Sequence, residues 1–140
     1  MVGILLVTHN GLGDSFVDCV KHVLGEVPPN LKVLSVLAND DPQQKLVEGE
    51  ALIKQLDSGS GVLILADVFG ATPSNVGRQL CHTERVMGVA GVNLPMLLRV
   101  VCYPNKTMPE LARIAVEGGR ECIVYIDSEG CDASRRCTDY

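Results

Sequence analysis

Two residues with reactive side chains, His9 and Asp67, each stand just after an apolar run. Residues 2–7 precede His9 and residues 62–66 precede Asp67, and both runs are typical of strands buried inside a sheet. An imidazole can act as a nucleophile, and a carboxylate can orient it by binding its second ring nitrogen. Taken singly, His9 could merely satisfy a backbone group and Asp67 could merely cap a loop.

A third polar group follows Asp67 closely. Thr72 precedes Pro73, and a threonine before a proline is typical of a helix start. The N-terminus of a helix offers free N–H groups and partial positive charge, which favour an anion. An imidazole, an orienting carboxylate, a hydroxyl and a helix N-terminus together suit a phosphoryl group carried on His9. Thr72 is also fully explained as a helix cap.

The elements that must position these groups alternate along the chain. Besides the two apolar runs, residues 31–37 and 85–91 predict strands, and residues 121–126 predict a fifth strand at a sheet edge. Capping residues, prolines and glycines mark helices between the strands. The first expected helix follows Gly11 and Gly13 and starts at Asp14 or Ser15. The next two are expected over residues 42–56 and 73–81, the fourth from residue 94 toward 102, and the fifth from Thr107 to Gly118-Gly119.

This alternation indicates an α/β fold: a doubly wound, mostly parallel sheet in the order 2-1-3-4, with helices on both faces and a C-terminal edge strand. Strands one and three are neighbours in that order, so His9 and Asp67 would face each other where ligands collect. Residues 1–126 are expected to form the domain, and residues 127–140 a polar tail.

Composition narrows the classes of partner. The 140 residues carry a net charge of −5, and the longest basic run is Arg135-Arg136, which argues against nucleic acid and anionic membranes. No stretch reaches the roughly 18 apolar residues of a membrane span, and the first apolar run lacks the flanks of a signal peptide. We therefore expect a soluble, cytoplasmic protein without direct membrane insertion.

The cysteines do not indicate a metal site or disulfides. No pair of the six cysteines has the two-residue spacing of a zinc knuckle. We expect free thiols, no metal and no cofactor. Four cysteines lie in apolar patterns typical of a core and two in the polar tail, namely Cys19, Cys81, Cys102 and Cys122, then Cys131 and Cys137.

Three separated segments resemble one known family. They are Thr8-His9, residues 67–75 (DVFGATPSN) and residues 91–96 (GVNLPM). In this order they resemble the enzyme IIA component of the mannose family of the bacterial phosphoenolpyruvate-dependent sugar phosphotransferase system, over roughly residues 1–126. The resemblance implies that His9 accepts a phosphoryl group from the phosphocarrier protein HPr and passes it to a histidine of an enzyme IIB component. It also implies a homodimer in which C-terminal strands join the partner's sheet.

The resemblance assigns roles to further residues. Asp67 matches the aspartate that binds the other imidazole nitrogen. Thr72, with the backbone at Gly70 and Ala71, would bind the phosphate oxygens. The remaining matches line the site, and they are Thr8, Phe69, Asn93 and Pro95.

Two positions depart from the family pattern. Val68 lacks a hydroxyl that some members carry, and Ala71 replaces a common glycine, which restricts the loop backbone. Neither change touches the histidine–aspartate pair.

Other functions remain open at this point. The same phosphorylation could serve as a regulatory signal that controls binding to a target. A nucleotide- or flavin-binding module would need a glycine motif such as GxGxxG or GxxxxGK[ST], and the sequence contains neither. The phosphoryl-donor subunit of dihydroxyacetone kinase shares the fold and the histidine, but residues 70–73 and 93–96 fit the sugar family better.

Overall fold

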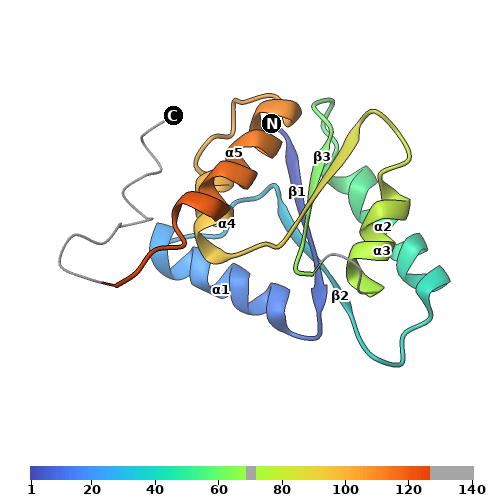
Figure 1. Cartoon of the computed structure of the whole chain (residues 1–140). Helices are drawn as coiled ribbons and strands as arrows, with labels where there is room; N and C mark the ends of the chain where they lie inside the picture. Colours follow the sequence, from blue (N-terminus) through green and yellow to red (C-terminus); the bar gives the residue numbers. More distant parts are fainter. Residues whose placement is uncertain (69–71, 127–140) are drawn as a thin grey trace.

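A parallel sheet forms the centre of the molecule. In the computed structural model, which describes residues 1–68 and 72–126, the strands lie in the order β2-β1-β3-β4, and each neighbouring pair is parallel (Figure 1). The predicted order 2-1-3-4 is thereby confirmed. The bounds are β1 Gly3–His9, α1 Leu12–Leu24, β2 Leu31–Val36, α2 Pro42–Leu56, β3 Val62–Ala66, α3 Thr72–Leu80, β4 Val86–Ala90, α4 Leu94–Val101 and α5 Met108–Glu121.

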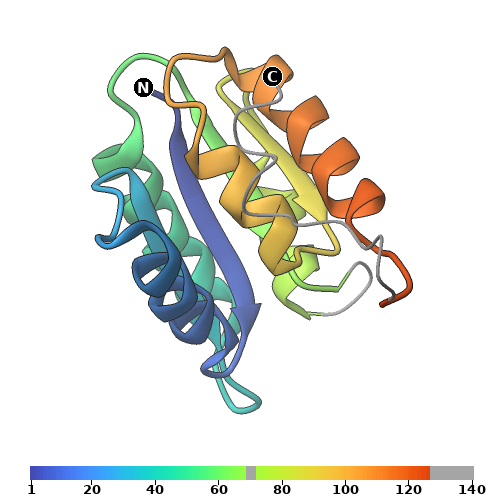
Figure 2. The same ribbon diagram turned by 90° about the vertical axis from the view of Figure 1, so that its left-hand side faces the viewer.

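Helices cover both faces of this sheet, as predicted. Figures 1 and 2 show α1, α4 and α5 on one face and α2 and α3 on the other. Successive strand residues point to opposite faces, so Ile4 and Leu6 pack toward the first layer, while Leu5 and Val7 pack toward the second. Because both faces are covered, β1 is buried from Gly3 to Thr8, and only His9 at its end is exposed.

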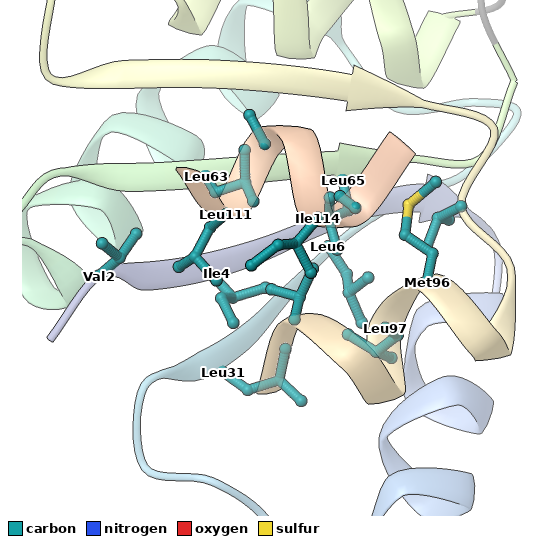
Figure 3. Packing of buried hydrophobic residues seen from close by; sticks show 14 of the residues in the cluster. Val2, Ile4, Leu6, Leu31, Leu63, Leu65, Met96, Leu97, Leu111 and Ile114 are labelled. Carbon is teal, nitrogen blue, oxygen red and sulfur yellow. The ribbon is translucent and has the colours of Figure 1, made fainter. Parts of the chain in front are cut away.

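The larger core fills the space beneath α4 and α5. Figure 3 shows Leu6 of β1 and Leu65 of β3 meeting Leu97 of α4 and Ile114 of α5. These side chains are at most 5% exposed. Burial of aliphatic groups on this scale is the main force that holds β1 and β3 side by side, and the site depends on that pairing.

The C-terminal part of the fold differs from the prediction. The helix does not end at Gly118-Gly119 but continues to Glu121, and residues 123–126 have no regular structure, so the predicted fifth strand is wrong for this stretch. The two glycines allow close packing inside α5: a Cβ at Gly118 would lie 2.6 Å from Arg99 Cδ, and one at Gly119 would lie 2.9 Å from Met96 Cε. The expected tail, 127–140, lies outside the described residues.

The start of α1 also differs. Neither Asp14 nor Ser15 caps the helix, because it begins earlier, at Leu12, with Gly11 as a cap that makes no side-chain hydrogen bond. Gly13 and Val20 are buried on the inner face of α1. Cys19 falls on the other side and is exposed, so its expected core role is wrong, whereas Cys81, Cys102 and Cys122 are half-buried. Cys131 and Cys137 lie outside the described residues.

Within residues 1–68 and 72–126, no helix combines the length and the apolar character that crossing a membrane requires.

One ion pair at the amino edge of the sheet leads to a prediction about acid stability. Asp57, the C-cap of α2, accepts two hydrogen bonds of 2.7 Å from Arg85 and one of 2.9 Å from Gly59 N. The bonds from Arg85, then that from Gly59, hold the pKa of Asp57 far below its ordinary range. A carboxylate with a lowered pKa stabilises the fold fully above its unfolded pKa, about 3.9, and loses that contribution as the pH falls further.

We therefore expect Asp57→Asn to lower the melting temperature at pH 7 and to make its decline between about pH 4 and pH 2 shallower than in the wild type. Thermal unfolding followed by circular dichroism at several pH values measures both effects. The exposed carboxylate Glu50 on α2 provides the control, because Glu50→Gln should leave the acid profile unchanged. Parallel acid profiles for wild type and Asp57→Asn would contradict the prediction.

Candidate functional site

The strand order brings His9 and Asp67 into direct contact. β1 and β3 are paired along their length as far as Val7 and Ala66, so the residues just beyond meet at the carboxyl edge of the sheet. Asp67 Oδ2 lies 2.9 Å from His9 Nδ1 and accepts a second hydrogen bond of 2.9 Å from the His9 backbone N–H. The sequence-predicted pair is therefore assembled within hydrogen-bonding distance.

Asp67 is held as a charged, fully engaged carboxylate. Its side chain is only 7% exposed, and its second oxygen, Oδ1, accepts a hydrogen bond of 2.9 Å from Val68 N. Burial raises the pKa of this carboxyl, but the hydrogen bonds from the His9 backbone, the His9 ring and Val68 N outweigh burial and lower the pKa. At neutral pH the pair thus offers a negative charge beside the imidazole.

The second ring nitrogen of His9, Nε2, takes no part in the contact with Asp67. When Nδ1 carries the proton and donates a hydrogen bond to Asp67 Oδ2, the lone pair lies on Nε2. The His9 side chain is 46% exposed, so a reacting group can approach Nε2 from outside. Across the part of the chain that the structure describes, there is no group of three or more His, Cys, Asp or Glu side chains placed to bind a metal.

The residues on either side of His9 differ in exposure. Thr8 is completely buried, whereas Asn10 is exposed and has a φ of 47°, in the left-handed region. The two glycines of this turn do not take that conformation, since Gly11 has a φ of −87° and Gly13 is helical. Asn10 was missed, although asparagine is one of the few residues that tolerate this conformation.

The other predicted site residues lie at the starts of α3 and α4 or outside the described residues. Thr72 is exposed and is the first residue of α3, whose N-terminus thus follows five residues after Asp67. Asn93 accepts a hydrogen bond from Met96 N (2.9 Å) and donates one to Gly119 O (3.0 Å). Its side-chain amide therefore links the first turn of α4 to the last part of α5. Pro95 lies half-buried in the first turn of α4. Phe69, Gly70 and Ala71 lie outside the described residues.

Exposed apolar side chains surround the pair at this edge. Leu12 opens α1, Leu37 follows β2 beyond the partner of His9, and Val68 follows Asp67. Their exposed fractions are 43%, 52% and 53%. These three residues, the apolar rim, place exposed aliphatic groups at the same edge of the sheet as His9.

Comparison with known proteins gives a consistent result. A family profile described as "PTS system fructose IIA component" (EIIA-man) matches residues 3–115. The chain is 30% identical over 105 residues to the sorbose-specific EIIA component of Lacticaseibacillus casei, covering 73% of each chain. It is 28% identical over 123 residues to the mannose-specific EIIAB component of Escherichia coli K12, covering 86% of this chain and 38% of that relative's length.

Solved structures share the fold. A mannose/sorbose-specific IIA subunit from Enterococcus faecalis superposes with a TM-score of 0.81 at 24% identity, covering 94% of this chain and 98% of that one. An EIIA component from Streptococcus agalactiae gives a TM-score of 0.77 at 22% identity, with coverages of 89% and 97%. The arrangement of helices around a 2-1-3-4 sheet is thus that of these structures.

Proposed function

Since the chain belongs to the family of PTS system fructose IIA components, with a role in the sugar phosphotransferase system, we propose that it carries a phosphoryl group on His9. The group would arrive from phosphorylated HPr and leave to a histidine of an enzyme IIB component, in the cytoplasm. The observation that carries the proposal is the 2.9 Å contact between His9 Nδ1 and Asp67 Oδ2 beside a half-exposed ring.

The transfer can be stated in balanced steps. The Nε2 lone pair of neutral His9 attacks phosphorus in line, and the bond between phosphorus and the donor breaks as the new N–P bond forms. The ring, still protonated on Nδ1, becomes cationic, and the adjacent Asp67 carboxylate stabilises that charge. Transfer to the IIB histidine reverses these changes. Positioning and charge stabilisation are what phosphoryl transfer chiefly needs.

The N-terminus of α3 is proposed to bind phosphoryl oxygens. Thr72 opens this helix on the strand-end side of the sheet and its side chain is exposed, so its hydroxyl can donate to an anion there. The positive end of the α3 dipole adds to the effect. The backbone N–H groups at Gly70 and Ala71 are proposed to bind further phosphoryl oxygens beside Thr72, as the resemblance implies.

The apolar rim supports protein partners over a small substrate. Leu12, Leu37 and Val68 expose aliphatic groups around His9, and a partner that buries them would exclude water from the transfer. Since donor and acceptor must each bring phosphorus to Nε2, HPr and IIB would use the same face in turn.

A direct test is incubation of the protein with phosphoenolpyruvate, enzyme I and HPr, followed by mass spectrometry. We expect a gain of one phosphoryl group, labile to acid and mapped to His9, and its loss when a mannose-type IIB component is added. Absence of phosphate after incubation with active HPr would refute the proposed function. Phosphate that is gained but never passed on to IIB would instead favour the regulatory alternative.

We further propose a homodimer formed through β4. This strand is an edge of the sheet in the described part of the chain, and an open edge readily pairs with another strand. Next to it, a hollow of about 230 Å³ is lined by Val89, Val116 and Ile123, among others. Ile123 is 76% exposed and Tyr125 is 93% exposed, and a second copy would cover this apolar stretch, residues 123–126.

The dimer yields a prediction with two truncations. A chain that lacks residues from Ile123 onward should be monomeric at micromolar concentration by light scattering, because its apolar stretch is gone while α5 stays complete. A chain that lacks only residues 130–140 should keep both the dimer and phosphorylation. A monomeric full-length protein, or loss of either property in the shorter truncation, would contradict the prediction.

A further inference from the structure

Thr8, the residue before His9, carries a buried hydroxyl without a hydrogen-bond partner among the residues that the structure describes. Its side chain is 0% exposed. A buried hydroxyl that makes no hydrogen bond destabilises a fold, and an apolar group of the same shape is better tolerated. The unpartnered hydroxyl of Thr8 therefore carries a cost in stability that calls for an explanation.

The hydroxyl faces the first turn of α1. A Cβ built on Gly13 would lie 2.7 Å from Thr8 Oγ1 and 2.5 Å from Val33 Cγ1, which is too close for any side chain. The backbone of α1 therefore rests directly on the Thr8 side chain. A hydroxyl is smaller than a methyl group, so this contact determines how closely the first turn of α1 approaches the end of β1.

That first turn has free hydrogen-bond donors. Gly11, the N-cap, supplies no side-chain acceptor, and the first N–H bonded into the helix is that of Ser15, at 3.1 Å from Gly11 O. Among the described residues, the N–H groups of Leu12, Gly13 and Asp14 find no backbone acceptor, as is usual at a helix start. They lie only three to five residues after His9, at the edge of the sheet where His9 Nε2 is reached.

We propose that the first turn of α1 is a second site for the phosphoryl oxygens on His9, and that Thr8 is the positioning residue that sets its distance. The inference rests on the proposed phosphorylation of His9. The oxygens would lie between two helix N-termini, that of α3 and that of α1, each with its positive dipole end directed toward them. Thr8 itself does not touch the phosphoryl group.

Two variants of Thr8 test the role of the hydroxyl. Thr8→Val should melt close to the wild-type temperature, because removal of the unpartnered hydroxyl offsets the crowding of Gly13 by the larger methyl group. Its rate of phosphorylation at saturating HPr should nevertheless fall roughly tenfold, equivalent to about 1.4 kcal/mol, because the added methyl hydrogens push the first turn outward. Thr8→Ser keeps the hydroxyl and should restore the rate.

A matched control, Thr107→Val, should show the opposite effects on stability and on phosphorylation rate. Thr107 caps α5 at the opposite edge of the sheet, where its Oγ1 accepts from Glu110 N at 3.4 Å and donates to Glu110 Oε1 at 2.8 Å. Thr107→Val should therefore lose stability and keep the wild-type phosphorylation rate. A rate loss that follows stability alone would appear in this control, whereas a positioning effect appears only in Thr8→Val.

Amide NMR reports directly on the α1 donors. On phosphorylation of the wild type, the amide protons of Leu12, Gly13 and Asp14 should move downfield, and Thr8→Val should reduce the shift. The inference is overturned if His9 is phosphorylated while these amides stay in place, or if Thr8→Val reacts within twofold of the wild-type rate. Failure of the wild type to be phosphorylated at all would refute the proposed function, and this inference with it.

Discussion

Replacing His9 by alanine is expected to abolish phosphorylation of the protein by HPr while the fold is retained. The ring supplies the only proposed nucleophile, so its removal leaves no atom to carry phosphorus. The fold should survive because Asp67 Oδ2 still accepts from the backbone N–H of residue 9, and Oδ1 still accepts from Val68 N. Mass spectrometry of the reaction mixture and a melting curve measure the two outcomes.

The two remaining histidines serve as controls. His22 is exposed on α1, and His82 is exposed just beyond α3, where its Nδ1 lies 3.2 Å from Gln79 O. His22→Ala and His82→Ala should each be phosphorylated like the wild type. Phosphate on either residue in His9→Ala would show that the nucleophile has been assigned wrongly.

The Asp67→Asn variant should slow phosphorylation by about ten- to a hundredfold. The cationic phosphoimidazole would lose its counter-charge, and hydrogen bonds to charged groups are worth about 1.5–3 kcal/mol. At about 1.4 kcal/mol per tenfold, this range corresponds to the stated loss of rate. Rapid-quench measurement at saturating HPr separates this effect from weaker docking.

The Asp67→Asn variant should also lose some stability, which the position of Asp67 at a strand end would not suggest. Both carboxylate oxygens accept backbone N–H groups, from His9 and from Val68. An amide offers one acceptor, so its NH₂ must face one of these donors. We expect a modest fall in melting temperature, with the chain still folded.

A suitable control is Asp18→Asn, which removes an exposed carboxylate from α1. It should leave the rate within twofold of the wild type, because Asp18 has no described contact with His9. An Asp67→Asn variant that also reacts at the wild-type rate would mean that the carboxylate does not stabilise the charged ring.

Several features followed from the sequence because they depend on local patterns. Two apolar runs typical of strands buried on both faces, alternating with capped helices, predicted a mostly parallel sheet, and 2-1-3-4 is a common strand order for such a fold. The contact between His9 and Asp67 then followed from topology alone, although 58 residues separate them. Capping also placed the starts of α2 at Pro42 and of α5 at Met108 correctly, because a cap is a contact between near neighbours.

Other features depended on contacts that no local pattern contains. Gly118 and Gly119 look like a helix end, but close packing on Arg99 and Met96 keeps them inside α5. The alternation in residues 121–126 resembles that of a strand. A strand, however, needs a neighbouring strand to bind its backbone, and residues 123–126 do not join the sheet in the described part of the chain.

The sequence by itself determined the alternation of buried strands with capped helices, because these patterns depend on the residues of each segment alone. The strand order common to such folds then predicted the pairing of His9 with Asp67. Only the tertiary structure decided that Asn10 takes the left-handed turn and that the Thr8 hydroxyl is buried against Gly13. Those facts depend on how closely α1 approaches β1, and such distances arise only when separate elements pack together.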